Sequence, residues 1–268
     1  MSVLTRLAGE RTFKLATASV VALLILFFVM IVVSLIGFTD GRTILSTLLS
    51  DEIVFAIKLS LATATAATVL SMLVAVPVAY AVSSAKFPGK DIIDTILDLP
   101  IVISPVALGA ALLVFFNTPV GSTIEERVVR FVFEVPGIIL AQFTVVVALA
   151  VRLLKSTFDS IDPRYEQVGR TLGCSKVKVF LKVTLPLARN GLVAAAVLTW
   201  ARAIGEFGAT VTLAGATKMK TETLPIAVFL NLSSANVERA VAVILILILI
   251  AAVALFSLRR ITGSRQQL

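Results

Sequence analysis

Two ionisable side chains near the middle of a long apolar segment are the most chemically informative residues of this sequence. Arg202 and Glu206 lie four positions apart, so a helix would place them on the same face. A charge near the centre of a bilayer costs roughly 2.5–3.5 kcal/mol on insertion scales, so both residues need compensation. Either they form an ion pair with each other, or they lie beside a pathway in which a cation lowers the barrier to an anion.

Small residues surround this charged pair. Ala201, Gly205, Gly208 and Thr212 recur at helical spacing, which predicts a smooth stripe on one side of a single helix. Such stripes allow helices to pack closely, and a gate at the interface between two copies of the chain is the alternative interpretation. The candidate pathway or gate residues are Arg202, Gly205, Glu206, Gly208 and Thr210.

The residue types that are missing argue against an enzyme. The sequence has no histidine and a single cysteine, Cys174, so it offers neither a Cys/His cluster for zinc nor a Ser-His-Asp or Cys-His nucleophilic site. It also lacks the glycine-rich loop ending in Gly-Lys-Ser/Thr that cradles nucleotide phosphates. We therefore expect no catalytic residue, no metal site and no resident cofactor.

The composition indicates which elements must position these residues. Apolar residues make up 58% of the chain and charged residues 15%, and the mean hydropathy is +1.03; soluble domains carry about 25% charged residues. So much apolar surface requires lipid as its solvent. A pI near 10.0 would suit nucleic acid, but Lys and Arg mostly flank the apolar segments. We expect an integral membrane protein that contacts lipid and no nucleic acid.

Six apolar segments are long enough to cross a bilayer, since a helical span needs about 20 residues. The predicted spans are about 13–37, 55–82, 92–116, 131–153, 190–214 and 238–258. A shorter apolar segment, 223–237, predicts a lateral helix on the outer side that begins at Leu224 and Pro225. The first segment is longer than a signal-peptide core and is expected to be retained. We predict one all-α domain over 1–268.

The distribution of positive charge predicts the orientation. Six spans place both termini on the same side of the membrane. Most Lys and Arg residues outside the spans lie on that side, before the first span, in the long loop after the fourth, and in the tail. Because positively charged loops stay inside, both termini are predicted to be cytoplasmic.

The third span carries signals of its own. Pro100 and Pro105 predict a kink or a new helix start, because proline cannot donate a backbone hydrogen bond. Its cytoplasmic mouth is expected to carry three aspartates at helical spacing, Asp91, Asp94 and Asp98. These carboxylates would repel an anion, so we expect them to be solvated or paired with Lys90 or Arg152.

The longest polar segment, 154–189, predicts two short helices joined by a sharp corner. Asp162 is a suitable N-cap, Pro163 suits the first helical position, and Gly173 accommodates the left-handed residue that ends the first helix. Ser175 can cap the second helix, which is expected to end near Pro186. A short exposed helix of this kind suits docking to a partner or lying on anionic lipid, and periodicity does not separate the two.

This segment resembles the EAA loop of binding-protein-dependent ABC permeases. Gly173, Val183, Leu185 and Pro186 match that family's spacing, whereas the Glu-Ala-Ala triplet is replaced by Gln-Val-Gly with a glutamate one position earlier. The resemblance implies a coupling helix that fits a cleft on an ATPase subunit. The implied docking residues are Asp162, Pro163, Arg164, Tyr165, Glu166, Gln167, Val168, Gly169, Arg170, Thr171, Leu172 and Gly173.

Two further segments are similar to the molybdate/tungstate branch of these permeases, with the sulfate permeases next. They are Trp-Ala-Arg-Ala-Ile-Gly-Glu-Phe-Gly-Ala-Thr at 200–210 and Asp-Leu-Pro-Ile-Val-Ile-Ser-Pro at 98–105. The string Thr-Glu-Thr-Leu-Pro at 221–225 also resembles the branch, but Glu222 stands where a basic residue is expected.

The resemblance implies the type I, MetI-like importer architecture in a prokaryotic inner membrane. It implies a homodimer of this chain, two ABC ATPase subunits that bind ATP and Mg²⁺, and an extracytoplasmic oxyanion-binding protein that delivers molybdate or tungstate. A permease for sulfate or another oxyanion is one alternative. An ion-coupled secondary transporter is the other; of its hallmarks, only a deep titratable pair, Arg202 and Glu206, is present.

Overall fold

The computed structural model describes residues 3–84 and 89–263, and every regular element within these ranges is a helix. In chain order the elements are α1 (Val3–Phe38), α2 (Gly41–Leu48), α3 (Asp51–Ser84), α4 (Lys90–Val102), α5 (Pro105–Phe116), α6 (Pro119–Arg127), α7 (Val135–Asp159), α8 (Arg164–Thr171), α9 (Lys176–Val179), the π-helical segment η1 (Phe180–Thr184), α10 (Leu185–Leu187), α11 (Arg189–Ile204), α12 (Gly208–Ala214), α13 (Leu224–Ser233) and α14 (Val237–Gly263).

Within the described residues, four unbroken helices are long and apolar enough to cross a bilayer: α1, α3, α7 and α14. Two bent pairs satisfy the same test together, α4 with α5 and the 176–187 helix with α11. Counting each pair as one span gives six. The predicted all-α membrane architecture is confirmed, and α13 forms the short apolar helix predicted to begin at Leu224.

The third predicted span, 92–116, is not straight. Its two halves, α4 and α5, meet at an angle of 105°. The bend falls at Ile103 and Ser104, and Pro105 occupies the start of α5, where its missing N–H costs nothing. The proline signal is confirmed at Pro105, whereas Pro100 lies inside α4.

The fourth and fifth spans differ from their predicted boundaries. Helix α7 begins at Val135 and not at 131, because the Glu125 carboxylate accepts hydrogen bonds from the backbone N–H groups of Phe131 and Val132, which holds these residues in a turn. The predicted continuous span 190–214 is wrong. Its helix ends at Ile204 and resumes at Gly208, because the Glu206 side chain caps the new helix.

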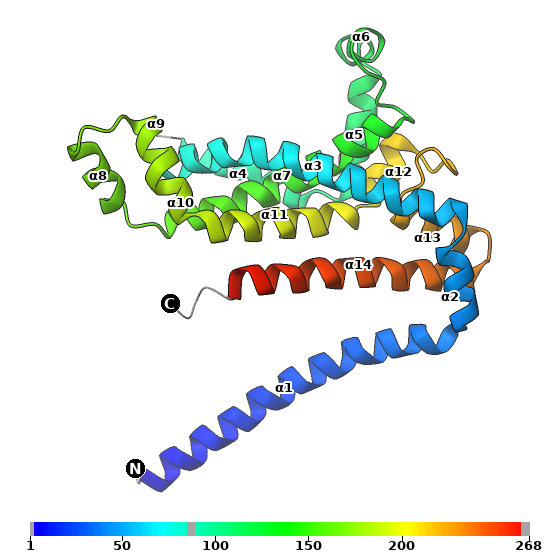
Figure 1. Cartoon of the computed structure of the whole chain (residues 1–268), viewed down its shortest axis with the longest axis horizontal. Helices are drawn as coiled ribbons and strands as arrows, with labels where there is room; N and C mark the ends of the chain where they lie inside the picture. The colour runs from blue at the N-terminus through cyan, green and yellow to red at the C-terminus, as the bar shows by residue number, and fades with distance from the viewer. Residues whose placement is uncertain (1–2, 85–88, 264–268) are drawn as a thin grey trace.

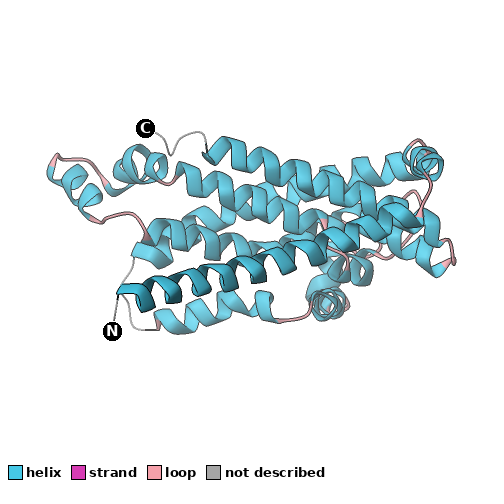
Figure 2. Ribbon diagram, turned by 90° about the horizontal axis from the view of Figure 1, so that it is seen from below, coloured by secondary structure: helices cyan, strands magenta, loops and turns pink. Residues whose placement is uncertain are grey.

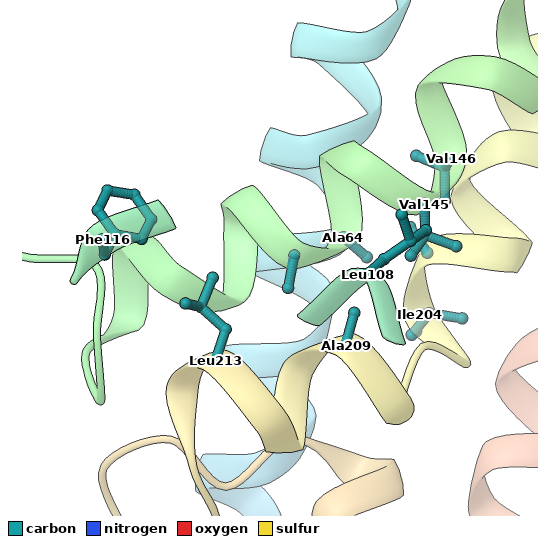
Figure 3. Packing of buried hydrophobic residues seen from close by; sticks show 10 residues of the cluster. Ala64, Leu108, Phe116, Val145, Val146, Ile204, Ala209 and Leu213 are labelled. Carbon is teal, nitrogen blue, oxygen red and sulfur yellow. The ribbon is translucent and has the colours of Figure 1, made fainter. Parts of the chain in front are cut away.

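The core lies where long helices run side by side. Helices α3 and α7 pack along much of their length, and α11 lies against both (Figure 1). Figure 3 shows Leu108 of α5, Ala209 and Leu213 of α12 and Val145 of α7 converging on one buried cluster. Helix α1 stands apart from this bundle (Figure 1). Nearly all the side chains of its spanning part are exposed.

The two ends of the bundle carry different parts. The start of α1 and the end of α14 lie at the end that also carries α8 and α9 (Figures 1 and 2). Helices α12 and α13 lie at the opposite end (Figure 1). The helix pair of the long polar loop and the break between α11 and α12 are therefore far apart, and α11 runs between them.

Candidate functional site

Helix α8 is the short helix predicted in the polar loop, and its ends form as the sequence indicates. The Asp162 carboxylate accepts a hydrogen bond from the backbone N–H of Arg164 at 2.9 Å. Gly173 adopts a φ of +82°, and its N–H donates to the carbonyl oxygen of Arg170. The Ser175 hydroxyl accepts from the N–H of Lys178, which caps α9. The predicted helix, its end signals at Asp162 and Gly173 and the Ser175 cap of α9 are confirmed, although α8 begins at Arg164, one residue after Pro163. The docking role of α8 stays a prediction.

One exposed face of α8, continued by the C-cap residue Leu172, is apolar. Tyr165, Val168 and Leu172 lie at offsets of 0, 3 and 7, and their exposed fractions are 56%, 58% and 78%. Residues at this spacing share one side of a helix. Contiguous exposed apolar side chains on a polar loop mark an interaction surface. We name Tyr165, Val168 and Leu172 the docking face.

The opposite face of α8 is turned toward the rest of the molecule. Glu166 and Gly169 are half-buried, whereas their neighbours along the helix are exposed. A Cβ on Gly169 would lie 3.0 Å from a methyl carbon of Val179, so α8 packs directly on α9. Glu166 accepts hydrogen bonds from the hydroxyls of Tyr80 and Thr184. Of the predicted docking residues, Glu166 and Gly169 therefore do not belong to the docking face.

The helix after α8 changes its pitch before it reaches the membrane segment. It continues from α9 into the π-helical segment η1 and ends with α10 at Leu187, next to Pro186 as predicted. Proline has no N–H to donate to the carbonyl oxygen one turn earlier in an α-helix. A π turn is a local adjustment to such a missing hydrogen bond. The chain then bends by 72° into α11.

Arg202 and Glu206 form the predicted ion pair. The Arg202 guanidinium lies 2.7 Å from Glu206 Oε2, and the Glu206 side chain is 1% exposed. Glu206 Oε1 accepts a hydrogen bond from the N–H of Ala209 at 3.0 Å, which caps α12. The buried Gln142 side chain donates to the carbonyl of Ala203, just before the break. Glu206 is thus both a counter-ion and a helix cap.

The predicted smooth stripe on one continuous helix is wrong, because the helix breaks between its members. A Cβ on Gly208 would lie 2.9 Å from a methyl carbon of Val106 in α5, so Gly208 serves close packing within the chain. Gly205 is exposed, and the nearest neighbour of a Cβ there would be 3.8 Å away. The Thr210 hydroxyl is buried and has no hydrogen-bond partner among the described residues.

Two of the three aspartates of α4 pair with cations of α7, whereas Asp91 is exposed. Asp98 lies 2.7 Å from Arg152, and Asp94 lies 3.9 Å from Lys155. The pairing predicted with Arg152 is confirmed, whereas Asp94 uses a different lysine. These two contacts connect α4 to α7.

A cluster of charged side chains beside the buried Glu222 joins α3, the loop before α13 and α14, and it was not predicted from the sequence. Glu52 pairs with Lys218 and Arg239 at 2.9 Å each, and Glu222 is 0% exposed. Burial raises the pKa of the Glu222 carboxyl above its ordinary value of 4.5, and the neighbouring Glu52 carboxylate raises this pKa further. The one sequence signal was the glutamate at a position where a basic residue was expected.

Residues 67–265 match the family described as the inner membrane component of binding-protein-dependent transport systems. The chain belongs to this family. It is a multi-pass inner-membrane subunit of an ABC importer, and the family identified from the EAA-like loop is confirmed.

Relatives of this permease have related substrates in their names. It is 35% identical over 190 residues to the molybdenum transport system permease protein ModB of Haemophilus influenzae, which covers 70% of this chain and 83% of that protein. It is 32% identical over 221 residues to the sulfate transport system permease protein CysW of Escherichia coli, covering 81% and 76%.

A solved structure shows the same fold. One chain of a bacterial ABC transporter involved in the import of the acidic polysaccharide alginate superimposes with a TM-score of 0.77 at 16% identity. The match covers 98% of this permease and 100% of that chain. The fold of ABC importer permeases expected from the resemblance is therefore confirmed.

Proposed function

We propose that this permease forms the transmembrane pathway of an ATP-driven importer of molybdate or tungstate. It would act as a homodimer with two ABC ATPase subunits, which hold ATP and Mg²⁺, and would receive the oxyanion from an extracytoplasmic binding protein. The docking face is the main observation that supports the proposal, because it offers an apolar surface outside the bundle to which an ATPase subunit can bind. The resemblance to the molybdate/tungstate branch supports the choice of molybdate or tungstate as the proposed substrate.

The docking face suits a protein partner better than a lipid surface. Two of its three apolar side chains stand on a helix of 8 residues, and Leu172 follows directly after it; Asp162 and Gly173 fix the two ends of this segment. A pre-ordered element binds a partner with little loss of conformational entropy. Lipid binding would require a longer amphipathic surface to bury comparable area. Docking, left open by periodicity, is therefore the interpretation we favour.

The orientation follows from the end of the bundle at which α8 lies. The helix shares that end with the start of α1 and the end of α14 (Figure 2). The Lys and Arg residues of the sequence concentrate in the same segments, and positively charged segments remain in the cytoplasm. The proposal places α8 in the cytoplasm, where ATP is available, and the loop before α13 on the side of the binding protein.

The α11–α12 break is the proposed part of the pathway. Arg202 keeps a side chain that is 39% exposed while Glu206 neutralises most of its charge. A fully unpaired arginine would hold a dianion tightly, and conduction requires sites weak enough to release it. The pair therefore suits a pathway that lowers the barrier to an oxyanion without storing it. Gly205, Gly208 and Thr210 remain the other proposed pathway or gate residues.

Reconstitution tests the whole proposal. The permease, its ATPase and the loaded binding protein are placed in proteoliposomes, and uptake of radiolabelled molybdate, tungstate and sulfate is measured with and without ATP. We expect ATP-dependent uptake of molybdate and tungstate that excess sulfate does not abolish. Uptake by the permease alone under an ion gradient would contradict an ABC mechanism. Because of the similarity to the sulfate permease CysW, preferential sulfate uptake is the second candidate outcome.

A further inference from the structure

The inward face of α8 holds a carboxylate that the docking face does not use. Glu166 belongs to the segment expected to touch an ATPase, yet its side chain points back into the permease. Its two oxygens accept hydrogen bonds from two different parts of the chain. The Thr184 hydroxyl donates to Oε1 at 2.5 Å, and the Tyr80 hydroxyl donates to Oε2 at 3.3 Å.

Tyr80 is a rigid partner because aromatic rings hold it on two sides. Its ring centroid lies 4.5 Å from that of Phe180 and 5.8 Å from that of Phe158. Phe158 is buried near the end of α7, and Phe180 begins η1. Packing of this kind fixes the ring plane and therefore the direction of the hydroxyl. Glu166 is thus tied to the end of α3 at a point where α7 and η1 also meet.

Thr184 connects the same carboxylate to the helix that leads into the membrane. It is 2% exposed and closes η1, directly before α10 and the 72° bend into α11. Helix α11 ends at the break capped by Glu206. A π turn inside a helix often marks a functional site. Among the described residues, Glu166 accepts both of the side-chain hydrogen bonds that connect α8 to other helices, one from α3 and one from η1.

We propose that Glu166 is a positioning residue that couples movement of α8 to α3 and to the bent helix that runs from α9 to α11, through Tyr80 and Thr184, without itself contacting the ATPase. This inference rests on the proposed function, because it assumes that a partner moves α8. Rigid elements transmit a displacement when polar contacts fix their relative positions. Without this carboxylate, α8 keeps its end caps and its packing on Val179 but loses both lateral ties.

The central experiment separates docking from coupling. Glu166→Ala and Glu166→Gln are compared with Glu126→Ala, a substitution of an exposed glutamate on α6 at the far end of the molecule (Figure 1). The ATPase should co-purify with all three variants. In proteoliposomes, Glu166→Ala should import about tenfold less molybdate per ATP hydrolysed, because it removes two hydrogen bonds to a charged acceptor. Glu126→Ala should keep the wild-type ratio.

Rescue by the conservative variant distinguishes positioning from simple loss of fold. A glutamine can still accept from Thr184 and can donate to the Tyr80 oxygen, so Glu166→Gln should recover most of the transport per ATP. General misfolding would lower ATP hydrolysis and import together and would leave their ratio unchanged. An unchanged ratio in Glu166→Ala overturns the proposal, and so does loss of ATPase co-purification in that variant.

A measurement on the permease alone keeps the inference separate from the proposed function. Hydrogen–deuterium exchange of the α8 amides should rise about tenfold in Glu166→Ala and similarly in Tyr80→Phe and Thr184→Val, with no rise in Glu126→Ala. If the wild-type permease binds no ATPase, the proposed function fails even when exchange confirms the tie. If exchange at α8 is the same in Glu166→Ala and wild type, the tie does not exist and the inference fails.

Discussion

The carboxylates of Glu166 and Glu206 both have hydrogen-bond or ion-pair partners within the protein, but the partners lie at very different distances along the chain. Glu206 is 1% exposed, and its partners, Arg202 and the N–H of Ala209, lie within four residues along the chain. Glu166 is half-buried, and its partners lie 86 and 18 residues away. The first cluster stabilises a local break in one helix. The second joins three separate segments.

This difference indicates what each region can do. A local ion pair and cap keep their geometry when neighbouring helices shift, because all partners move together. A contact between distant segments transmits a shift, because its partners belong to different helices. The α11–α12 break is therefore suited to hold a fixed irregularity in the pathway, and the docking end is suited to pass on motion.

The largest expected effect comes from removing the local carboxylate. Glu206→Ala removes the counter-ion of Arg202, uncaps α12 and leaves a cavity at a site that is 1% exposed, and a large-to-small change at a buried site costs about 2–5 kcal/mol. We expect a marked loss of folded permease in SDS titrations of the purified protein in mixed micelles. Glu206→Gln should recover part of this loss, because its carbonyl oxygen can still accept from Ala209.

An exposed ion pair provides the matched control. Asp98→Ala breaks a contact of the same length, 2.7 Å, in which the side chains of Arg152 and Asp98 are 57% and 29% exposed. Such pairs contribute about 0.2–1 kcal/mol, so the unfolding midpoint should barely change. Equal losses of stability in Glu206→Ala and Asp98→Ala would show that the Glu206 contacts stabilise the permease no more than an exposed ion pair does.

The ion pair between Arg202 and Glu206 could be predicted from the sequence, whereas the contacts of Glu166 with Tyr80 and Thr184 could not. The spacing of Arg202 and Glu206, the caps at Asp162 and Ser175 and the left-handed Gly173 all depend on neighbours within four residues, so chain order contains them. The Glu166 contacts depend on how α3 and η1 pack, which no local pattern encodes. The helix break also escaped prediction, because hydropathy cannot show that the Glu206 side chain competes with the helix backbone.

The second effect concerns the docking face. Leu172→Ser removes the most exposed of its three apolar side chains, and truncating an anchor at the centre of an interface costs about 2 kcal/mol. ATPase affinity, measured by co-purification or biolayer interferometry, should fall about thirtyfold. Val128→Ser is the control, since Val128 is 71% exposed at the end of α6 and lies far from α8. Unchanged affinity in Leu172→Ser would remove the docking face as the partner's site.

The third effect tests which glycines near the break serve packing. Gly208→Ala places a Cβ 2.9 Å from a methyl carbon of Val106, and overpacking of this kind costs about 1–3 kcal/mol. Gly205→Ala adds a methyl group with no neighbour closer than 3.8 Å and should leave stability nearly unchanged. Thermal unfolding followed by tryptophan fluorescence compares the two variants. Equal midpoints would mean that α12 does not depend on its close approach to α5.

The smallest effect extends the comparison to a third glutamate, in the loop before α13. Burial raises the pKa of Glu222, with Glu52, Lys218 and Arg239 as the charged groups around it. A carboxyl whose folded-state pKa is raised favours the folded state below the ordinary value of 4.5, and this contribution is lost as the pH rises through the raised pKa. Wild type should therefore lose stability relative to Glu222→Gln as the pH increases.

Glu222→Gln keeps the shape of the buried side chain and an oxygen that can accept from the N–H of Met219, as the carboxylate does at 3.0 Å. The difference in unfolding midpoint between the variant and wild type, followed from pH 5 to pH 8, should grow in favour of the variant as the pH rises. A constant difference would mean that Glu222 does not titrate in this range. A difference that grows in favour of wild type would mean that the carboxylate is stabilised by Lys218 and Arg239, and Glu222 would then act as a buried counter-ion like Glu206.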